Sequence, residues 1–248
     1  MAAVAGPVRY SNDAVANSEA AKEFPWEAPI PANRFWDSFK YCIVRSVLIN
    51  FPDQEELRQL PIDPDSTNDE PTKLRLLLQI LREKLAREEA ATSPPGSLNT
   101  QNYTHWNQLV QGIYVVENEL DLPEAEQTVR TLVERRPDES NIVPPHMLSE
   151  YLVKHGKYEE AERTARPVVA WMDAQPHIGK ASPQALNSRR IIAKALWFQG
   201  PSRRTEANAL IAEIRELVEG MGGTKFEVYQ EEERQFNEEL IADLQKEA

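Results

Sequence analysis

The sequence has few of the features that mark secreted, membrane-spanning or phosphate-binding proteins: it contains one cysteine, nine glycines and no long apolar run. The single cysteine, Cys42, excludes an intrachain disulfide and fits a reducing compartment. No stretch approaches the roughly 20 apolar residues that a membrane-spanning helix needs. The first residues also lack the basic patch and apolar run of a secretory signal.

Positive charge is scarce as well, because 28 Lys and Arg residues face 40 Asp and Glu residues, which gives a formal net charge of -12. A general nucleic-acid binder normally carries a basic surplus that neutralises phosphates. Docking on anionic membrane surfaces also needs a surplus of positive charge. We therefore expect a cytoplasmic protein, with the nucleus as the alternative, whose partners are neither nucleic acid nor membrane.

Motifs of catalysis and cofactor binding are missing from the sequence. The glycines of Gly220–Lys225 follow a helical pattern rather than a strand and lack phosphate-loop spacing. The four histidines have no second His or Cys at ligand spacing, and Asp63–Asp69 lacks the glycine and glutamate of a calcium loop. We expect no catalytic residue, no metal and no cofactor.

What the sequence does contain is helical periodicity. Apolar residues recur at spacings of three and four, and no segment alternates with a period of two, which predicts an all-α fold. Residues 1–32 are rich in Ala, Pro, Ser and Asn and predict a flexible or extended arm. Residues 33–97 predict an N-terminal helical hairpin, with helices over 33–50 and 72–91, and a linker. Cys42 is expected to be a small buried hydrophobe in the first of these helices.

Residues 98–220 contain a repeating pattern of paired helices. In each pair an alanine opens the second helix, with apolar residues four and seven positions later; these alanines are Ala125, Ala161 and Ala207. Antiparallel helices need a small residue where their backbones approach most closely, and such pairs bury their apolar stripes by stacking on one another. Gly156 and Gly200 suit the left-handed conformation that ends a first helix, whereas the first pair lacks this glycine.

These residues resemble the tetratricopeptide repeat family. The stretch Lys154–Glu162 is similar to the family's inter-helix turn, and Trp106, Leu109 and Pro137 match its opening and closing positions. The key alanines lie 36 and 46 residues apart, against about 34 in the standard repeat, so the repeats are similar in type to the longer ones of kinesin light chains and fungal proteins. The resemblance implies a right-handed α-solenoid of antiparallel hairpins over residues 98–220, about half of the chain.

Residues 221–248 predict a C-terminal capping helix. Its apolar positions are Tyr229, Phe236, Leu240 and Leu244, and residues 226–248 hold eight acidic and two basic residues, a net charge of -6. Helical arrays need a terminal helix with a polar outer face to close the stack. The acidic character of the chain is thus concentrated at this end.

The resemblance also places a ligand site, because such arrays usually bind ligands on the concave face that is lined by the first helix of each pair. Arg190 would offer a bidentate fork to a carboxylate and Trp197 an apolar anchor, although these residues also fit ordinary exposed positions and a core tryptophan. The paired Lys and Asn residues with which some family members clamp chaperone tails are not reproduced. The candidate ligand-groove residues are Asn107, Gln111, Tyr114, His146, Glu150, Lys154, Arg190, Lys194 and Trp197.

We therefore expect a non-enzymatic adaptor or scaffold that binds a protein or peptide partner, with an acidic or carboxylate-bearing segment as the ligand. Two alternatives stay open. The first is an enzyme or small-molecule binder with a pocket between the N-terminal hairpin and the concave face. The second is a structural subunit that assembles into an oligomer, although the sequence favours a monomer.

Overall fold

In the computed structural model of the chain, Pro31 and residues 33–246 are described, so the predicted arm over 1–32 lies almost entirely outside the described residues. No strand occurs among the described residues, and the all-α prediction is confirmed. The helical elements are η1 (Trp36–Ser38), α3 (Tyr41–Leu48), α4 (Gln54–Arg58), α5 (Glu70–Ala91), α6 (Leu98–Gln101), α7 (Tyr103–Glu119), α8 (Glu124–Glu134), α9 (Val143–Lys154), α10 (Tyr158–Ala174), α11 (Pro183–Phe198), η2 (Pro201–Arg203), α12 (Arg204–Glu219), η3 (Glu227–Tyr229) and α13 (Gln230–Lys246).

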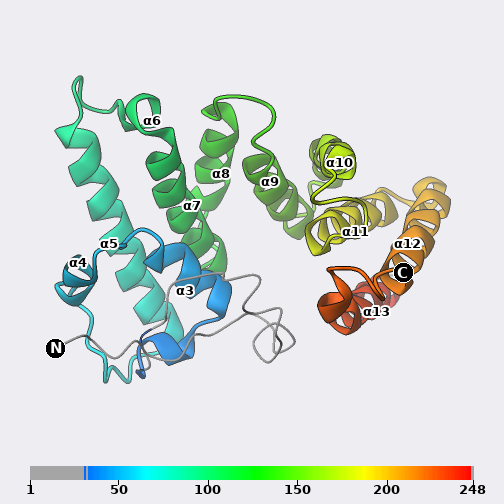
Figure 1. Cartoon of the computed structure of the whole chain (residues 1–248), viewed down its shortest axis with the longest axis horizontal. Coiled ribbons are helices and arrows are strands. Elements are labelled where there is room, and N and C mark those ends of the chain that lie inside the picture. Colours follow the sequence, from blue (N-terminus) through cyan, green and yellow to red (C-terminus); the bar gives the residue numbers. More distant parts are fainter. Residues whose placement is uncertain (1–30, 32, 247–248) are drawn as a thin grey trace. The chain divides into compact units, whose positions relative to one another are not determined.

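The described chain divides into two compact units, residues 33–137 and residues 138–246. The division falls inside the region that was predicted as repeats, not at residue 98. The reason is that α7 packs against α3 and α5 of the N-terminal segment as well as against α8. The first predicted repeat therefore shares its core with the N-terminal helices (Figure 1).

The start of the first unit differs from the single helix that was predicted over 33–50. After η1, Phe39 and Lys40 adopt extended backbone angles, and α3 begins only at Tyr41. This break shifts the phase of the apolar face, so Ile43 and Val47 are buried while Cys42 is exposed. The prediction of a buried Cys42 is therefore wrong, because it assumed a continuous helical period.

Gly112 marks a very close approach of two helices in the first unit. A Cβ atom at Gly112 in α7 would lie 2.8 Å from the carbonyl oxygen of Ser46 in α3. The side-chain amide of Asn50 donates to that same carbonyl at 2.8 Å and to the carbonyl of Gln108 at 3.4 Å. The absence of a side chain at position 112 thus lets α3 lie directly on α7.

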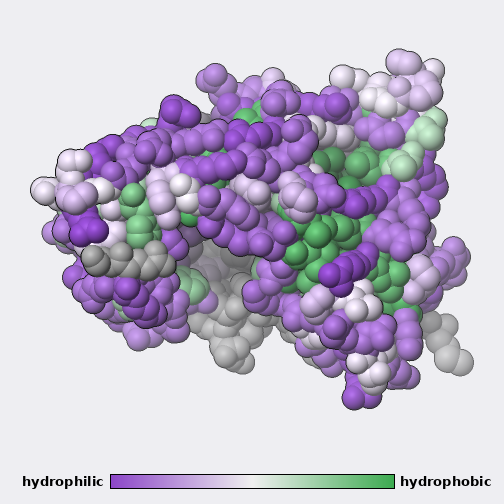
Figure 2. Space-filling model, turned by 180° about the vertical axis from the view of Figure 1, so that it is seen from behind, coloured by the Kyte–Doolittle hydropathy of each residue, from purple (hydrophilic) through white to green (hydrophobic). Residues whose placement is uncertain are grey.

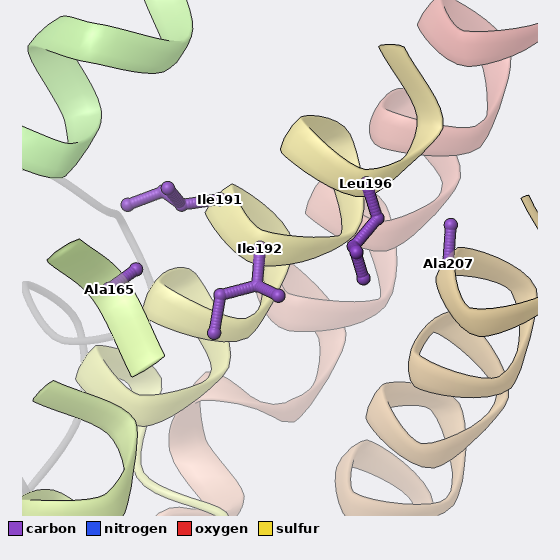
Figure 3. Close-up of a cluster of buried hydrophobic side chains, with 5 residues drawn as sticks. All are labelled: Ala165, Ile191, Ile192, Leu196 and Ala207. Atoms are coloured by element: carbon purple, nitrogen blue, oxygen red, sulfur yellow. The ribbon is translucent and has the colours of Figure 1, made fainter. Parts of the chain in front are cut away.

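In the second unit, α11 occupies the centre. It packs against α9, α10, α12 and α13, and consecutive helices form hairpins. Figure 3 shows one part of the core, in which Ile191, Ile192 and Leu196 of α11 meet Ala165 of α10 and Ala207 of α12. The three alanines expected at the closest helix approaches, Ala125, Ala161 and Ala207, are all fully buried.

The turns between paired helices explain how the first pair manages without a glycine. Asp121 takes the left-handed conformation (φ 53°) that Gly156 takes in the second pair (φ 73°). In both turns the next amide, of Leu122 or Lys157, donates to the carbonyl five residues earlier, at 2.9 and 2.8 Å. This hydrogen bond is the one that ends a helix in a Schellman motif, and Asp is among the few residues other than Gly that tolerate the conformation.

The third pair has a wider turn. Gly200 has φ 113° and ψ 178°, a region that is essentially restricted to glycine, and η2 follows before α12 begins. These residues, together with the Gln175–Ser182 connection, account for the longer spacing between the second and third alanines.

The surface seen from behind is mostly hydrophilic, with apolar side chains gathered over the first unit (Figure 2). Among the helices of residues 33–246, none combines the length and the apolar character that a bilayer-crossing segment requires.

Replacing Gly112 by alanine should lower the free energy of unfolding by about 1–3 kcal/mol, because the methyl group meets a backbone carbonyl and forces α3 away from α7. Helix propensity alone favours alanine by about 1 kcal/mol, so any loss observed is a packing effect. Urea denaturation measures the change. The matched control is Gly222→Ala, whose Cβ would have its nearest neighbour at 3.9 Å. Equal stabilities of the two variants would contradict the close approach.

Candidate functional site

The nine candidate residues are divided between the two units. Asn107, Gln111 and Tyr114 lie on α7 in the first unit, whereas the other six lie on α9 and α11 in the second. Tyr114 is buried in the core of its unit, and Asn107 accepts a hydrogen bond from the hydroxyl of Tyr103 at 3.2 Å. The residues that the structure brings together, His146 and Glu150 of α9 with Arg190 and Lys194 of α11, belong to the second unit.

Helix α11 is buried around almost its whole circumference. From Ala185 to Leu196, every residue is buried except Asn187 and Lys194, which are half-buried. These two residues are seven positions apart and therefore lie on the same side of the helix. α9 packs on one side of α11 and α13 also packs against it, so the open stripe of α11 is bordered by residues of both helices.

A polar network joins the open stripe to α9. The amide nitrogen of Asn187 donates to Glu150 Oε1 at 2.7 Å, and the Ser188 hydroxyl lies 2.9 Å from His146 Nδ1. His146 Nε2 lies 3.4 Å from Glu150 Oε1. A proton on Nε2 lets the ring donate to Glu150, while the Ser188 hydroxyl can either donate to Nδ1 or accept from it. Two hydrogen-bonded links thus hold α9 against α11.

The Glu150 carboxylate is ionised in this network although its side chain is partly buried. Burial acts to raise its pKa, but the hydrogen bond and charge of His146 and the hydrogen bond of Asn187 outweigh it and lower the pKa of Glu150 below its usual range. Its side chain is 44% exposed. A negative charge therefore faces solvent beside Asn187.

Ser188, His146 and Glu150 are also the residue types of a hydrolytic triad. Their order of contacts resembles one, but Ser188 is fully buried. A nucleophile must reach a substrate carbon, and this hydroxyl has no access to one. The network therefore connects the helices and carries one exposed carboxylate, and its geometry does not support acyl transfer.

Arg190, the predicted carboxylate fork, is used within the fold. It is only 8% exposed, and its Nη2 donates to the carboxylate of the buried Glu233 in α13 and to the Glu233 carbonyl at 3.2 Å. Burial raises the pKa of Glu233, and the charge and hydrogen bond of Arg190 offset this only in part. On the same side of α11, Lys194 is half-buried and has no hydrogen-bond or ion-pair partner within the described part of the chain.

The aromatic residue that faces solvent here is Phe236, not Trp197. Trp197 is half-buried and packs against two core clusters. The guanidinium of Arg204 lies over its ring, 4.8 Å from the ring centroid. Phe236 was counted among the apolar positions of the last helix, but unlike Leu240 and Leu244 it is 41% exposed. The stripe that α13 buries includes Glu233 and Asn237 instead. The Arg190 guanidinium lies 5.6 Å from the centroid of the Phe236 ring.

We call the surface formed by His146, Glu150, Asn187, Lys194 and Phe236 the α11 face. Sequence reasoning identified three of its members, His146, Glu150 and Lys194, and missed Asn187 and Phe236. Lys154 lies exposed at the end of α9. A signal for Asn187 was present, since it lies seven positions before Lys194 and therefore on the same side of the helix.

The described chain also contains a cavity and a charged cluster outside the α11 face. In the first unit a cavity of about 230 Å³ is lined by Phe51, Ile80 and Lys84 among others. The Lys84 ammonium is neutralised there by Glu56 at 2.6 Å and by Glu88 at 3.3 Å. Within the described residues, no three His, Cys, Asp or Glu side chains gather in a way that could hold a metal ion.

The charged cluster is a network that joins α10 to η2 and α12. The Glu162 carboxylate accepts from Arg203 at 2.8 Å, from Gln199 at 2.7 Å and from Arg166 at 2.8 Å. Burial acts to raise its pKa, yet these hydrogen bonds lower the pKa of Glu162 from an ordinary 4.5 to about 2. All of its charges are satisfied internally, so the network supports the fold.

Comparisons of the chain with family profiles, curated proteins and solved structures found no match.

The buried Arg190–Glu233 pair should show strong energetic coupling. Arg190→Met or Glu233→Met alone should lower the free energy of unfolding by about 3 kcal/mol, because each leaves a buried charge uncompensated. The double variant should return to within about 1 kcal/mol of the parent. The exposed pair Arg234–Glu219 is the matched control, with an expected coupling below about 1 kcal/mol. Simple additivity at 190 and 233 in urea denaturation would rule out the buried pair.

Glu162→Gln should destabilise the protein in a pH-dependent way. The pKa of Glu162 is depressed on folding, so its contribution is present above the unfolded value of 4.5 and is lost as the pH falls towards 2. Because Arg166 and Arg203 are partly exposed, we expect a loss of about 1–2 kcal/mol at pH 7 that shrinks steadily below pH 4.5. Denaturation curves from pH 7 to pH 3 measure it, with the exposed Glu216→Gln as the control. A difference that is constant over this range would contradict the assignment.

Proposed function

We propose that the chain is a non-enzymatic adaptor that binds a peptide segment of a partner protein along the α11 face. The observation that carries the proposal is the exposed ring of Phe236 beside the open stripe of α11. Large aromatic residues are the usual energetic centres of protein interfaces, particularly where polar groups surround them. The polar groups near Phe236 are Asn187 of α11 with Glu150 of α9, and Lys194 further along α11.

The helix packing supports this choice of face. We infer that the hairpins stack in a right-handed solenoid of the tetratricopeptide type, in which α9, α11 and α13 form one layer and α10 and α12 the other. The contacts of α11 with both α9 and α13, the buried alanines and the shared turn geometry support this inference. In such an array the layer formed by the first helices presents side chains to an extended ligand.

Two residues of this face can be changed without breaking the buried Arg190–Glu233 pair. Lys194 has no ion-pair partner within the described chain, and Phe236 is 41% exposed and touches Arg190 only through its ring face. Arg190 is unsuitable as a test residue, because charge reversal there would break the buried pair with Glu233. Variants at 236 and 194 therefore separate binding from stability.

Affinity capture with the tagged full-length chain, followed by mass spectrometry, tests the proposal. Phe236→Ser and Lys194→Glu should each reduce recovery of the specific partner about tenfold, since the first removes an apolar anchor and the second reverses a contact charge. Matched controls are Ile49→Ser, an exposed apolar residue of the first unit, and Lys180→Glu, an exposed lysine in the α10–α11 connection. Undiminished recovery by both test variants would reject the α11 face as the binding surface.

A further inference from the structure

The α11 face has opposite charges at its two ends, and their separation is fixed by one helix. Asn187 and Lys194 are the open positions of α11, seven residues apart. At a rise of 1.5 Å per residue they are about 10 Å apart along the helix axis. The spacing between Asn187 and Lys194 is therefore set by a single buried helix.

The end at Asn187 is negative. The Glu150 carboxylate is held there by the Asn187 amide at 2.7 Å, and its side chain remains 44% exposed. Only one of its oxygens, Oε1, takes part in the hydrogen bonds with Asn187 and His146. A cationic group of a ligand can approach the carboxylate from solvent and form a charge-assisted hydrogen bond.

The end at Lys194 is positive, because its ammonium has no carboxylate partner in the described part of the chain. The acidic side chain of α13 that faces α11, Glu233, is already paired with Arg190. The charges of Arg190 and Glu233 therefore cancel between the two ends. The solvent-exposed group there is the ring of Phe236, which packs against the Arg190 guanidinium.

We propose that the segment bound by the α11 face is dipolar, with a basic side chain for Glu150, an acidic side chain for Lys194 and an apolar side chain between them for Phe236. This proposal rests on the proposed function. An extended peptide advances about 3.3 Å per residue, so the basic and acidic residues are three positions apart. The purely acidic ligand that the sequence indicated is disfavoured, since one of its carboxylates would face Glu150.

Three short capped peptides test the ligand chemistry in NMR titrations of the labelled full-length chain. The first has arginine and glutamate three positions apart around a leucine. The second has glutamate at both charged positions and the third has arginine at both. The dipolar peptide should shift the signals of Asn187, Lys194 and Phe236 and bind about tenfold more tightly than either of the others.

Changing one charge of the protein should change the preference. Glu150→Gln, which keeps hydrogen-bonding capacity, should lower the affinity for the dipolar peptide several-fold and raise the affinity for the doubly acidic one. Lys194→Glu should do the reverse by favouring the doubly basic peptide. Lys180→Glu is the matched control and should leave all three affinities unchanged, and thermal unfolding of each variant verifies that it is folded.

The outcomes separate the two proposals. If the doubly acidic peptide binds the parent as tightly as the dipolar one and shifts the same signals, the dipolar specificity is wrong and the α11 face remains the binding surface. If no peptide moves these signals and partner capture is insensitive to Phe236→Ser, both proposals are wrong. A preference that follows the charge at positions 150 and 194 establishes the dipolar specificity.

Discussion

The second unit depends on neutralising two adjacent arginines, Arg189 and Arg190, both buried in α11. Arg189 donates to both carboxylate oxygens of Asp173 in α10, at 2.8 and 2.7 Å, and lies 3.3 Å from Glu213 in α12. Arg190 pairs with Glu233 in α13. A guanidinium stays ionised even when buried, so each needs a carboxylate from a neighbouring helix. Successive residues of a helix point about 100° apart, so the two arginines bind partners on different sides of α11.

These pairs set the register of the surrounding helices more tightly than apolar packing can. An alanine or leucine interface tolerates small displacements, whereas the hydrogen bonds from Arg189 to Asp173 and from Arg190 to Glu233 depend on distance and direction. The pair with Glu233 acts together with the buried Leu240 and Leu244 on the inward face of α13. With Glu233 and Asn237 buried on that side, Phe236 is turned outward and rests on the guanidinium that holds Glu233.

The sequence predicted the features that depend on local periodicity. The all-α class, the helix over 72–91 and the three buried alanines all follow from spacing along the chain. Two errors have the same physical origin, which is an orientation set by something outside the periodic pattern. Cys42 was misplaced because the extended residues before α3 reset the helical phase. Phe236 was grouped with Leu240 and Leu244 by its apolar side chain, whereas the buried position three residues earlier belongs to Glu233, which pairs with Arg190, 43 residues away.

Because α11 is buried on nearly every side, few of its central positions can change without cost. From Ala185 to Leu196, Lys194 is the half-buried position that makes no hydrogen bond to a neighbouring helix of the described chain, whereas Asn187 is bonded to Glu150. A change of charge at position 194 alters what the surface attracts while the free energy of folding stays nearly constant. Ligand preference can therefore drift in evolution through this position, separately from the constraints that keep the helices assembled.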